Sequence, residues 1–273
     1  MKLQVQNNDF LRLQIEDELV EIEVPSNTHA SLYLTYDKVE QLSLMITVAQ
    51  YASLKVLLEN TSEDDVNCNI KGMVFEGGNL NVGLLEVEKG NSNIHCQIQL
   101  KEPYAKADVM SATLAQSQKE YKVDIIHESR DSEGIMNHYA IIQDDAKYAM
   151  KASGIIQKGA SGSASHQKTR VLTMTKRHRC KVDPILLIDE DEVKASHAMT
   201  LGQMDENQLY YLMSRGLTRQ QALGLLSAGY LMPICNFFAN EEVNASMKEE
   251  MEKKVGLYVW CRKNTSGFSN ATK

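Results

Sequence analysis

Long apolar runs are missing from this sequence. No stretch of the 273-residue chain approaches the roughly 18 to 20 consecutive apolar residues that a membrane-spanning helix needs. The N-terminal segment MKLQVQNNDF also lacks the apolar core of a secretory signal peptide. These absences predict a cytoplasmic protein with no membrane partner.

Basic charge, cysteine motifs and phosphate-binding motifs are also scarce. The net charge of −7 argues against a nucleic-acid partner, which would favour a clustered basic surface. The five cysteines include no C-x-x-C pair, so neither a disulfide framework nor a self-contained zinc or ferredoxin-type site is expected. The segment KGASGSAS at 158–165 lacks the Gly-Lys-Ser/Thr ending of a phosphate-binding loop, and we predict no ATP site.

Short β-favouring runs fill most of the chain instead. Residues 1–30 are strand-like, with LQIEDELVEIEV alternating apolar and charged positions before a turn at 25–27. From residue 31 to residue 188, runs such as SLYLTY, CNIKGMVF and YKVDIIH start roughly every eleven to thirteen residues. An antiparallel sandwich or barrel and a β-helix solenoid both fit this spacing, and spacing alone slightly favours the sandwich.

A helical hairpin is predicted within residues 192–230. Asp205 followed by Gln208 has the form of an N-cap with its reciprocal partner, and Thr218 with Gln221 repeats that form. Gly216 supplies the left-handed residue that ends the first helix. The predicted apolar faces consist of residues at helical spacing: Leu209, Leu212 and Met213 in the first helix, and Ala222, Leu225, Leu226 and Gly229 in the second.

The rest of the C-terminal region is also predicted to be helical. Pro233 should kink or end the second helix, residues 241–254 form a further charged helix, and the tail after Lys263 is loose. The hairpin could cap the end of a solenoid. Its acidic first helix opposes a role as a DNA-binding helix-turn-helix.

Two segments carry a resemblance to a known family. They are HESRDSEGIMNHYAIIQDDAKYAMKASGIIQKGASGSASHQKTRVLTM and SHAMTLGQMDENQLYYLMSRGLTRQQA. The second is similar to a pattern of His-Gly-Ala-Thr or His-Glu-Ala-Thr, a Val/Leu-Gly pair and a Phe/Tyr-Tyr-Leu-x-Ser-Arg-Gly helix. The run from Tyr121 to about Phe238 thereby resembles the conserved core of the SufB/SufD family of iron–sulfur cluster assembly proteins.

The resemblance implies a fold and a domain organisation. It favours the solenoid, because members of the family have a parallel β-helix core followed by a C-terminal helical domain. We therefore expect a mostly β protein: a strand segment at 1–30, a right-handed parallel β-helix at 31–202 and a small helical domain at 203–273. Full-length members carry a large N-terminal region that this chain is too short to hold, so a short form is expected.

Two departures from the pattern indicate a SufD-like rather than a SufB-like chain. In the SufB branch the histidine of the tetrapeptide is followed by glutamate, and a cysteine used in cluster assembly lies on a strand upstream. Here Ala198 follows His197. Counting back from the shared Pro184 places Thr169 at the position of that cysteine.

The resemblance also implies a function. It predicts a non-catalytic subunit that dimerises through its β-helix, with itself or a SufB-like partner, and recruits the ABC-type ATPase SufC through its C-terminal helices. No cofactor would be tightly bound, although an iron–sulfur cluster could be shared transiently with a partner. His197 becomes the candidate iron or cluster contact, and capping of the last coil is its plainer alternative. The candidate ATPase-binding residues are Tyr210, Tyr211, Met213, Arg215 and Gly216.

Two other histidine–cysteine pairs invite comparison with His197. His178 and Cys180 are two residues apart, so on a strand they would share a face and could share a metal, although a polar turn with an incidental cysteine is the more common situation. His95 and Cys96 are adjacent and would lie on opposite faces, which prevents joint chelation. Cys96 is expected in the core.

Two alternative functions remain open. The chain could itself be the cluster scaffold, as a homodimer with SufC. A more remote alternative is a β-helix enzyme acting on carbohydrate, with acid–base carboxylates drawn from Asp124, Asp144 and Asp145. The aromatic content of only 6% gives that enzyme little support.

Overall fold

The computed structural model describes residues 1–143, 145–174, 179–238 and 240–254. The chain divides into two compact units, of which the first is Met1–Leu201 and the second begins at Gly202. The first unit contains the strands, except for the last two residues of the final strand, and the second contains the helices. Each unit is described by itself below.

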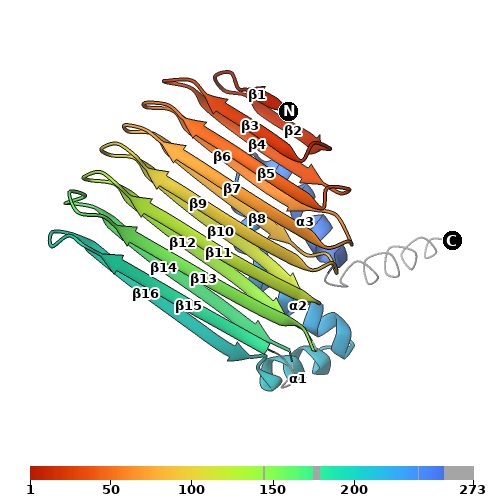
Figure 1. Cartoon of the computed structure of the whole chain (residues 1–273). Coiled ribbons are helices and arrows are strands. Elements are labelled where there is room, and N and C mark those ends of the chain that lie inside the picture. Colours follow the sequence, from red (N-terminus) through yellow and green to blue (C-terminus); the bar gives the residue numbers. More distant parts are fainter. Residues whose placement is uncertain (144, 175–178, 239, 255–273) are drawn as a thin grey trace. The chain divides into compact units, whose positions relative to one another are not determined.

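The first unit consists of two parallel sheets (Figure 1). One sheet contains the odd-numbered strands: β1 (Lys2–Gln4), β3 (Leu19–Val24), β5 (Gln41–Val48), β7 (Val66–Val74), β9 (Ser92–Leu100), β11 (Gln118–His127), β13 (Lys147–Ile156) and β15 (Arg179–Ile188). The other contains the even-numbered strands: β2 (Phe10–Ile15), β4 (His29–Tyr36), β6 (Ser53–Asn60), β8 (Asn79–Glu86), β10 (Lys106–Ala115), β12 (Glu133–Ile142), β14 (Ala164–Thr173) and β16 (Lys194–Gln203).

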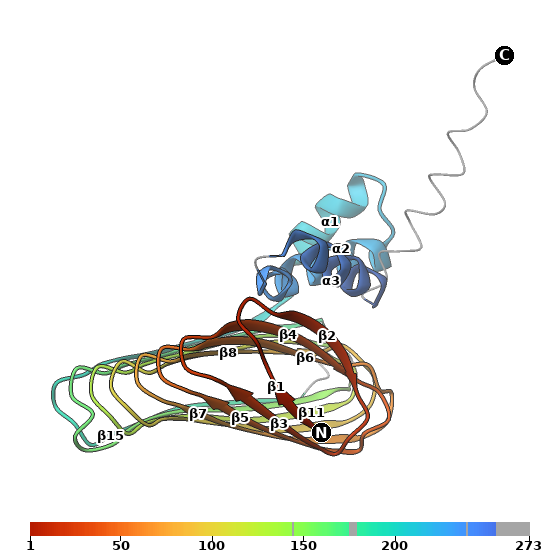
Figure 2. The ribbon, with the colours of Figure 1, turned by 90° about the horizontal axis from the view of Figure 1, so that it is seen from above.

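Successive strands alternate between the sheets, so the chain winds as a β-solenoid (Figure 2). Each strand pairs in parallel with the strand two places later, as β4 does with β6 and β6 with β8. The predicted parallel β-helix is therefore confirmed, and the sandwich alternative is wrong. Two strand starts per coil also explain why the sequence spacing is about half of one coil.

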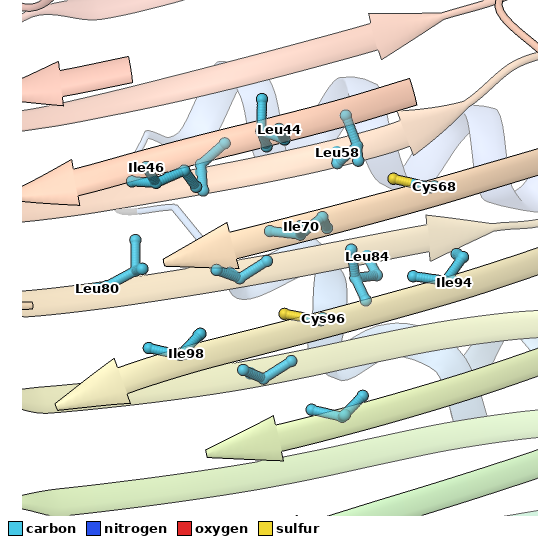
Figure 3. Close-up of a cluster of buried hydrophobic side chains, with 14 of the residues drawn as sticks. Leu44, Ile46, Leu58, Cys68, Ile70, Leu80, Leu84, Ile94, Cys96 and Ile98 are labelled. Carbon is cyan, nitrogen blue, oxygen red and sulfur yellow. The ribbon is translucent and has the colours of Figure 1, made fainter. Parts of the chain in front are cut away.

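The core lies between the two sheets. Alternate residues of the strands in the inner coils are buried, and equivalent positions stack from coil to coil. Leu44, Ile46, Leu80 and Ile98 belong to these stacks, together with Cys96, which was expected in the core (Figure 3). Burial of apolar surface stabilises the folded state by roughly 25 cal/mol for each Å². This continuous stack is therefore the main source of stability of the solenoid.

One row of the even-numbered sheet leads to the far end of the solenoid. It passes in register through Val56, Val82, Val109, Met136 and Gln167. The apolar members of the row are buried, and Gln167 is only 4% exposed. The row thus changes from apolar to polar near the last coil.

A repeated turn closes one side of the solenoid. In three successive coils, Tyr51, Gly77 and Tyr104 adopt a left-handed conformation, and the N–H of each donates to a carbonyl of the next coil. At Gly77 (φ 58°) an added Cβ would lie 2.6 Å from the Tyr51 ring, so a side chain at this position would require that ring to move. Hydrogen bonds between the turns therefore continue the ladder of the sheets.

The N-terminal run LQIEDELVEIEV is divided between two strands. β2 ends at Ile15, and β3 begins at Leu19, after a short turn. The three strands within residues 1–30 pair into the same two sheets as the later strands, as β3 does with β5. The alternation of apolar and polar residues breaks at the three consecutive acidic residues 16–18, which form the turn between the two strands.

The second unit contains α1 (Glu206–Ser214), α2 (Arg219–Leu231), the 3₁₀ helix η1 (Met232–Asn236) and α3 (Glu241–Lys254). Thr218 and Gln221 form the predicted capping box. Asp205 caps α1 through the N–H of Asn207, and the reciprocal bond from Gln208 predicted by its spacing is not part of that cap. Gly216 has a φ of 96°, as expected after a helix end.

The predicted apolar face of α2 is right at Ala222 but wrong at Leu225 and Gly229, which are exposed. Leu225 is 44% exposed, whereas Ala222, Ser227, Ala228 and Leu231 are buried. Small residues form most of the buried face because they allow close helix packing, so apolar character alone does not identify it. Pro233 lies in η1, directly after α2 ends, and α3 has the predicted bounds. The predicted loose tail after Lys263 lies outside the described residues.

Candidate functional site at the last coil

The solenoid ends at β15 and β16, the last strands of the two sheets in the described structure. Residues that would face a further coil are exposed here. They include apolar side chains from both strands, with Leu187 55%, Ile188 38%, Met199 50% and Leu201 50% exposed. Exposed strand edges and apolar side chains together favour pairing with another chain.

His197 lies in the middle of β16, and backbone hydrogen bonds establish its neighbour. The N–H of Lys194 donates to the carbonyl of Ser163 (2.9 Å). The preceding pair of strands, β12 and β14, shows how such a bond relates to the register. There, the residue whose N–H donates is in register with the residue that directly follows the acceptor residue in the chain. Lys194 is therefore in register with Ala164, and three residues further along both strands His197 is in register with Gln167.

The side chain of His197 belongs to the inner face of the last coil. The Oγ of Ser196 lies 2.7 Å from the Nδ1 of His166 on the outer face. Because successive side chains of a strand alternate, His197 is directed to the opposite face, which continues the core. It is nevertheless exposed, since β16 is the last strand of its sheet. His197 is thus an accessible imidazole at the open end of the solenoid.

A polar group lies beside His197 on this inner face. The Nε2 of Gln167 donates to the carbonyl of Ile185 (2.7 Å), while its buried Oε1 has no hydrogen-bond partner among the described residues. The buried Oγ of Ser165 likewise lacks a partner there. Gly154 makes room for both side chains, because an added Cβ would lie 2.2 Å from Ser165 Oγ and 3.2 Å from Gln167 Nε2.

Sequence reasoning missed Gln167. Nothing in the local pattern around this residue distinguishes it from any other glutamine on a strand. Its significance comes from a register between strands about thirty residues apart, which a single sequence does not reveal.

The other histidine–cysteine candidates are not brought together as ligands. His95 is on the outer face, where its Nε2 lies 3.4 Å from Asp124 Oδ2, and Cys96 is buried in the core, as their adjacency predicts. His178 lies outside the described residues. Cys180 is partly buried, in register with Tyr148.

The described cysteines are protonated thiols at neutral pH. Burial raises the pKa of Cys96 to about 12 and that of Cys235 to about 11, and it also raises the pKa values of Cys68 and Cys180. A thiol becomes a good metal ligand only when it is deprotonated. Consistently, no group of three or more His, Cys, Asp or Glu side chains with metal-binding geometry occurs within the described part of the chain.

The carboxylates considered for carbohydrate chemistry do not form a described pair. Asp124 is a buried side chain on β11 that contacts Lys122 (3.2 Å). Asp145 lies in the turn before β13, whereas the residue in register with Asp124 is Ser153, far along that strand. At about 3.3 Å per residue, Asp124 and Asp145 are more than roughly 20 Å apart, well beyond a glycosidase pair. Asp144 lies outside the described residues.

A buried polar cluster inside the solenoid was also missed. The Glu86 carboxylate accepts hydrogen bonds from Tyr36 (3.0 Å), Asn60 (3.1 Å), Ser92 (2.6 Å) and Lys119 (3.4 Å). The Lys119 side chain is 0% exposed, and that of Glu86 is 2% exposed. The sequence contains no local signal for this cluster, because its members come from five strands.

In the helical unit, α1 and α2 form a groove of about 480 Å³ lined by Asn207, Gln208, Tyr211, Leu212 and Leu226. The predicted partner-binding residues lie in or near this hairpin. Tyr210 is 75%, Tyr211 56% and Met213 42% exposed, and the Arg215 guanidinium lies 5.3 Å from the centre of the Tyr211 ring. Large exposed aromatic and methionine side chains of this kind are typical of interaction surfaces. The described helices include none with the length and apolar character required to cross a membrane.

Comparison with known proteins places these features in context. The sequence profile described as "SUF system FeS cluster assembly, SufBD core domain" matches residues 5–230. The iron–sulfur cluster assembly protein SufD of Bacillus subtilis is 38% identical over 135 residues, which are 50% of this chain and 31% of that protein. A SufBD family protein of Mycobacterium bovis is 26% identical over 243 residues, 84% of this chain and 28% of the relative. The matched segments thus cover less than a third of either relative.

Proposed function

Since the chain belongs to the SufBD core family of SUF-system iron–sulfur cluster assembly proteins, we propose that it is a SufD-like, non-catalytic subunit of a cluster assembly complex. In this proposal the open end of the solenoid binds a second SufB- or SufD-type chain, and the helical hairpin binds the ABC-type ATPase SufC. The cluster is the cargo of the complex, and His197 contacts iron or the cluster while it is assembled.

The open end of the solenoid is the observation that carries the proposal. β15 and β16 expose backbone edges and apolar side chains, and the accessible His197 lies on β16. Pairing with a second chain would extend the hydrogen-bonded sheets and remove Leu187, Met199 and Leu201 from water. It would also place His197 next to side chains of the partner, which could supply the remaining ligands.

The helical hairpin supports the second part of the proposal. Tyr210, Tyr211 and Met213 are exposed on α1, and Tyr211 lines the groove between α1 and α2. Nucleotide-driven movement of the ATPase could then alter the pairing of the two solenoids and expose His197 to iron and sulfide. Such coupling requires a dimer interface with two arrangements that nucleotide binding can bias.

A homodimeric scaffold is the second candidate. The solenoid end could pair with the same surface of another copy, since a two-fold interface is self-complementary. A cluster that is stable on this chain and SufC, with no SufB-like subunit present, would favour this alternative. The carbohydrate-enzyme alternative has no support from a convergent carboxylate pair among the described aspartates.

Co-expression with the SufC-type ATPase of the same organism tests the partner assignment. Under anaerobic conditions we expect co-elution in size-exclusion chromatography, with a mass that gives the stoichiometry. Deleting residues 205–273 should abolish ATPase binding, and Tyr211→Ala should weaken it at least about tenfold if this ring is an interface anchor. The exposed helix substitution Gln220→Ala serves as a control. Separate elution of the two wild-type proteins would refute the partnership.

The same experiment can examine the solenoid end. Leu187→Asp should dissociate the dimer while ATPase binding persists, because it introduces a charge into the proposed interface. Leu19→Asp changes a comparably exposed leucine, 46% against 55%, on a strand near the other end of the solenoid. Dimerisation that survives Leu187→Asp as well as it survives Leu19→Asp would contradict the assigned interface.

Substitution of His197 tests its role toward the cargo. We expect His197→Ala to lower cluster assembly in cells on the order of tenfold or more, without loss of the subunit complex. His166→Ala is the matched control, since this histidine lies on the outer face of the neighbouring strand. Equal assembly activity of the wild type and His197→Ala would show that the residue serves only to cap the coil.

A further inference from the structure

Gln167 is a buried polar side chain in which only one of the two polar atoms has a hydrogen-bond partner among the described residues. Its Nε2 donates to the carbonyl of Ile185 at 2.7 Å. This bond determines the orientation of the amide, because the reverse orientation would direct one oxygen at another. Oε1 is thereby committed as an acceptor, and it is buried without a partner among the described residues.

A buried acceptor without a hydrogen-bond partner lowers the stability of the folded protein. Its in-register neighbours indicate which group can donate to it. Along the row of the sheet, Met136 is in register on one side and offers no N–H or O–H. On the other side, the backbone pattern puts His197 in register with Gln167. In-register neighbours on parallel strands are about 4.8 Å apart, which brings an amide oxygen within reach of an imidazole N–H.

We infer that Gln167 is a positioning residue for His197: when the exposed imidazole, which does not contact Oε1 in the described conformation, rotates toward it, Oε1 accepts a hydrogen bond from one ring nitrogen and leaves the other nitrogen free to bind a metal. Gly154 permits this arrangement, because a side chain there would collide with Ser165 and crowd the Gln167 amide. The inference deepens the role proposed for His197 and rests on that role where metal binding is concerned. The hydrogen bond itself is independent of it.

The chemistry follows from the properties of imidazole. In the neutral ring one nitrogen carries the proton and the other carries a lone pair, and the hydrogen bond selects which is which. Histidines that bind metals commonly donate their second N–H to an acceptor of this kind, and loss of the acceptor lowers metal affinity about 10- to 100-fold. Gln167 would supply this acceptor from within the chain, before any partner or cargo binds.

The direct test is the tautomer of His197, measured by long-range ¹H–¹⁵N NMR of histidine-labelled full-length protein at alkaline pH. The spectrum of His197→Ala identifies the signals of this residue. We expect one dominant tautomer in the wild type. In Gln167→Leu the tautomer should change to the mixture typical of a free imidazole. Gln99→Leu, on the outer face of β9, is the control.

Two results would overturn the inference. One is a free-imidazole mixture in the wild type, and the other is a single tautomer that persists in Gln167→Leu. If Gln167→Leu fails to fold, the wild-type spectrum still decides, because a free-imidazole mixture there contradicts the hydrogen bond. These outcomes are distinct from failure of the proposed function, in which His197→Ala assembles clusters normally whatever the tautomer.

Discussion

Lys119→Met is expected to destabilise the solenoid by about 3 to 5 kcal/mol, because it leaves the carboxylate of Glu86 buried without its cation. Both side chains are almost completely shielded from water. Tyr36, Asn60 and Ser92 still donate to the carboxylate. These donors do not neutralise the charge of the carboxylate. The substitution is strongly destabilising because it leaves an uncompensated charge buried.

Urea unfolding of the variant measures this cost. Lys106→Met is the matched control, since Lys106 makes a similar ion pair of 2.9 Å with Glu133, but the two side chains are 54% and 39% exposed. Its loss should cost less than about 1 kcal/mol. Adding Glu86→Gln to Lys119→Met should recover much of the stability by removing the unpaired charge. Equal costs for the two lysine substitutions would disprove this explanation.

Acidification is expected to destabilise the solenoid through two buried histidines. The Nδ1 atoms of His127 and His138 lie 2.8 Å from Ser132 Oγ and 2.9 Å from Ser111 Oγ, respectively, and their Nε2 atoms lack partners among the described residues. Burial lowers the pKa of His127 to about 4 and that of His138 to about 3. Both rings are therefore neutral in the folded protein at physiological pH.

The direction of the pH effect on stability follows from proton uptake by the folded and unfolded protein. Between the unfolded pKa of about 6.5 and the lowered folded values, the unfolded chain binds more protons, so stability falls as the pH falls. Each histidine should lower the free energy of unfolding by roughly 2 kcal/mol at pH 5 relative to neutral pH. Asp108 acts in the opposite direction, because burial raises its folded pKa to about 6, and protonation below that value favours the folded state.

Unfolding free energies measured from neutral pH to about pH 5 can separate these contributions. His138→Gln should reduce the pH dependence by the share of one histidine, whatever its effect on absolute stability. His29→Gln, at an exposed strand start, controls for the histidine-to-glutamine exchange itself. A slope in His138→Gln equal to that of the wild type would mean that this ring is already protonated, or solvated, in the folded protein.

Local interactions determined what the sequence alone could establish. The strand runs follow from alternating apolar residues, and the capping box of Thr218 and Gln221 follows from contacts within one helical turn. The left-handed Gly216 is local in the same sense. The choice of a solenoid over a sandwich needed the family resemblance, because a strand buried on one face has the same alternation in both folds.

Tertiary structure alone decided the groups that come from distant segments. The Glu86 cluster collects side chains from five strands, and the buried face of α2 depends on packing by small residues rather than on apolar periodicity. His197 could be singled out in the sequence by its resemblance to a family pattern, but its neighbour Gln167 could not. That pairing depends on the register of stacked coils, which is set by the length of every turn and strand between them.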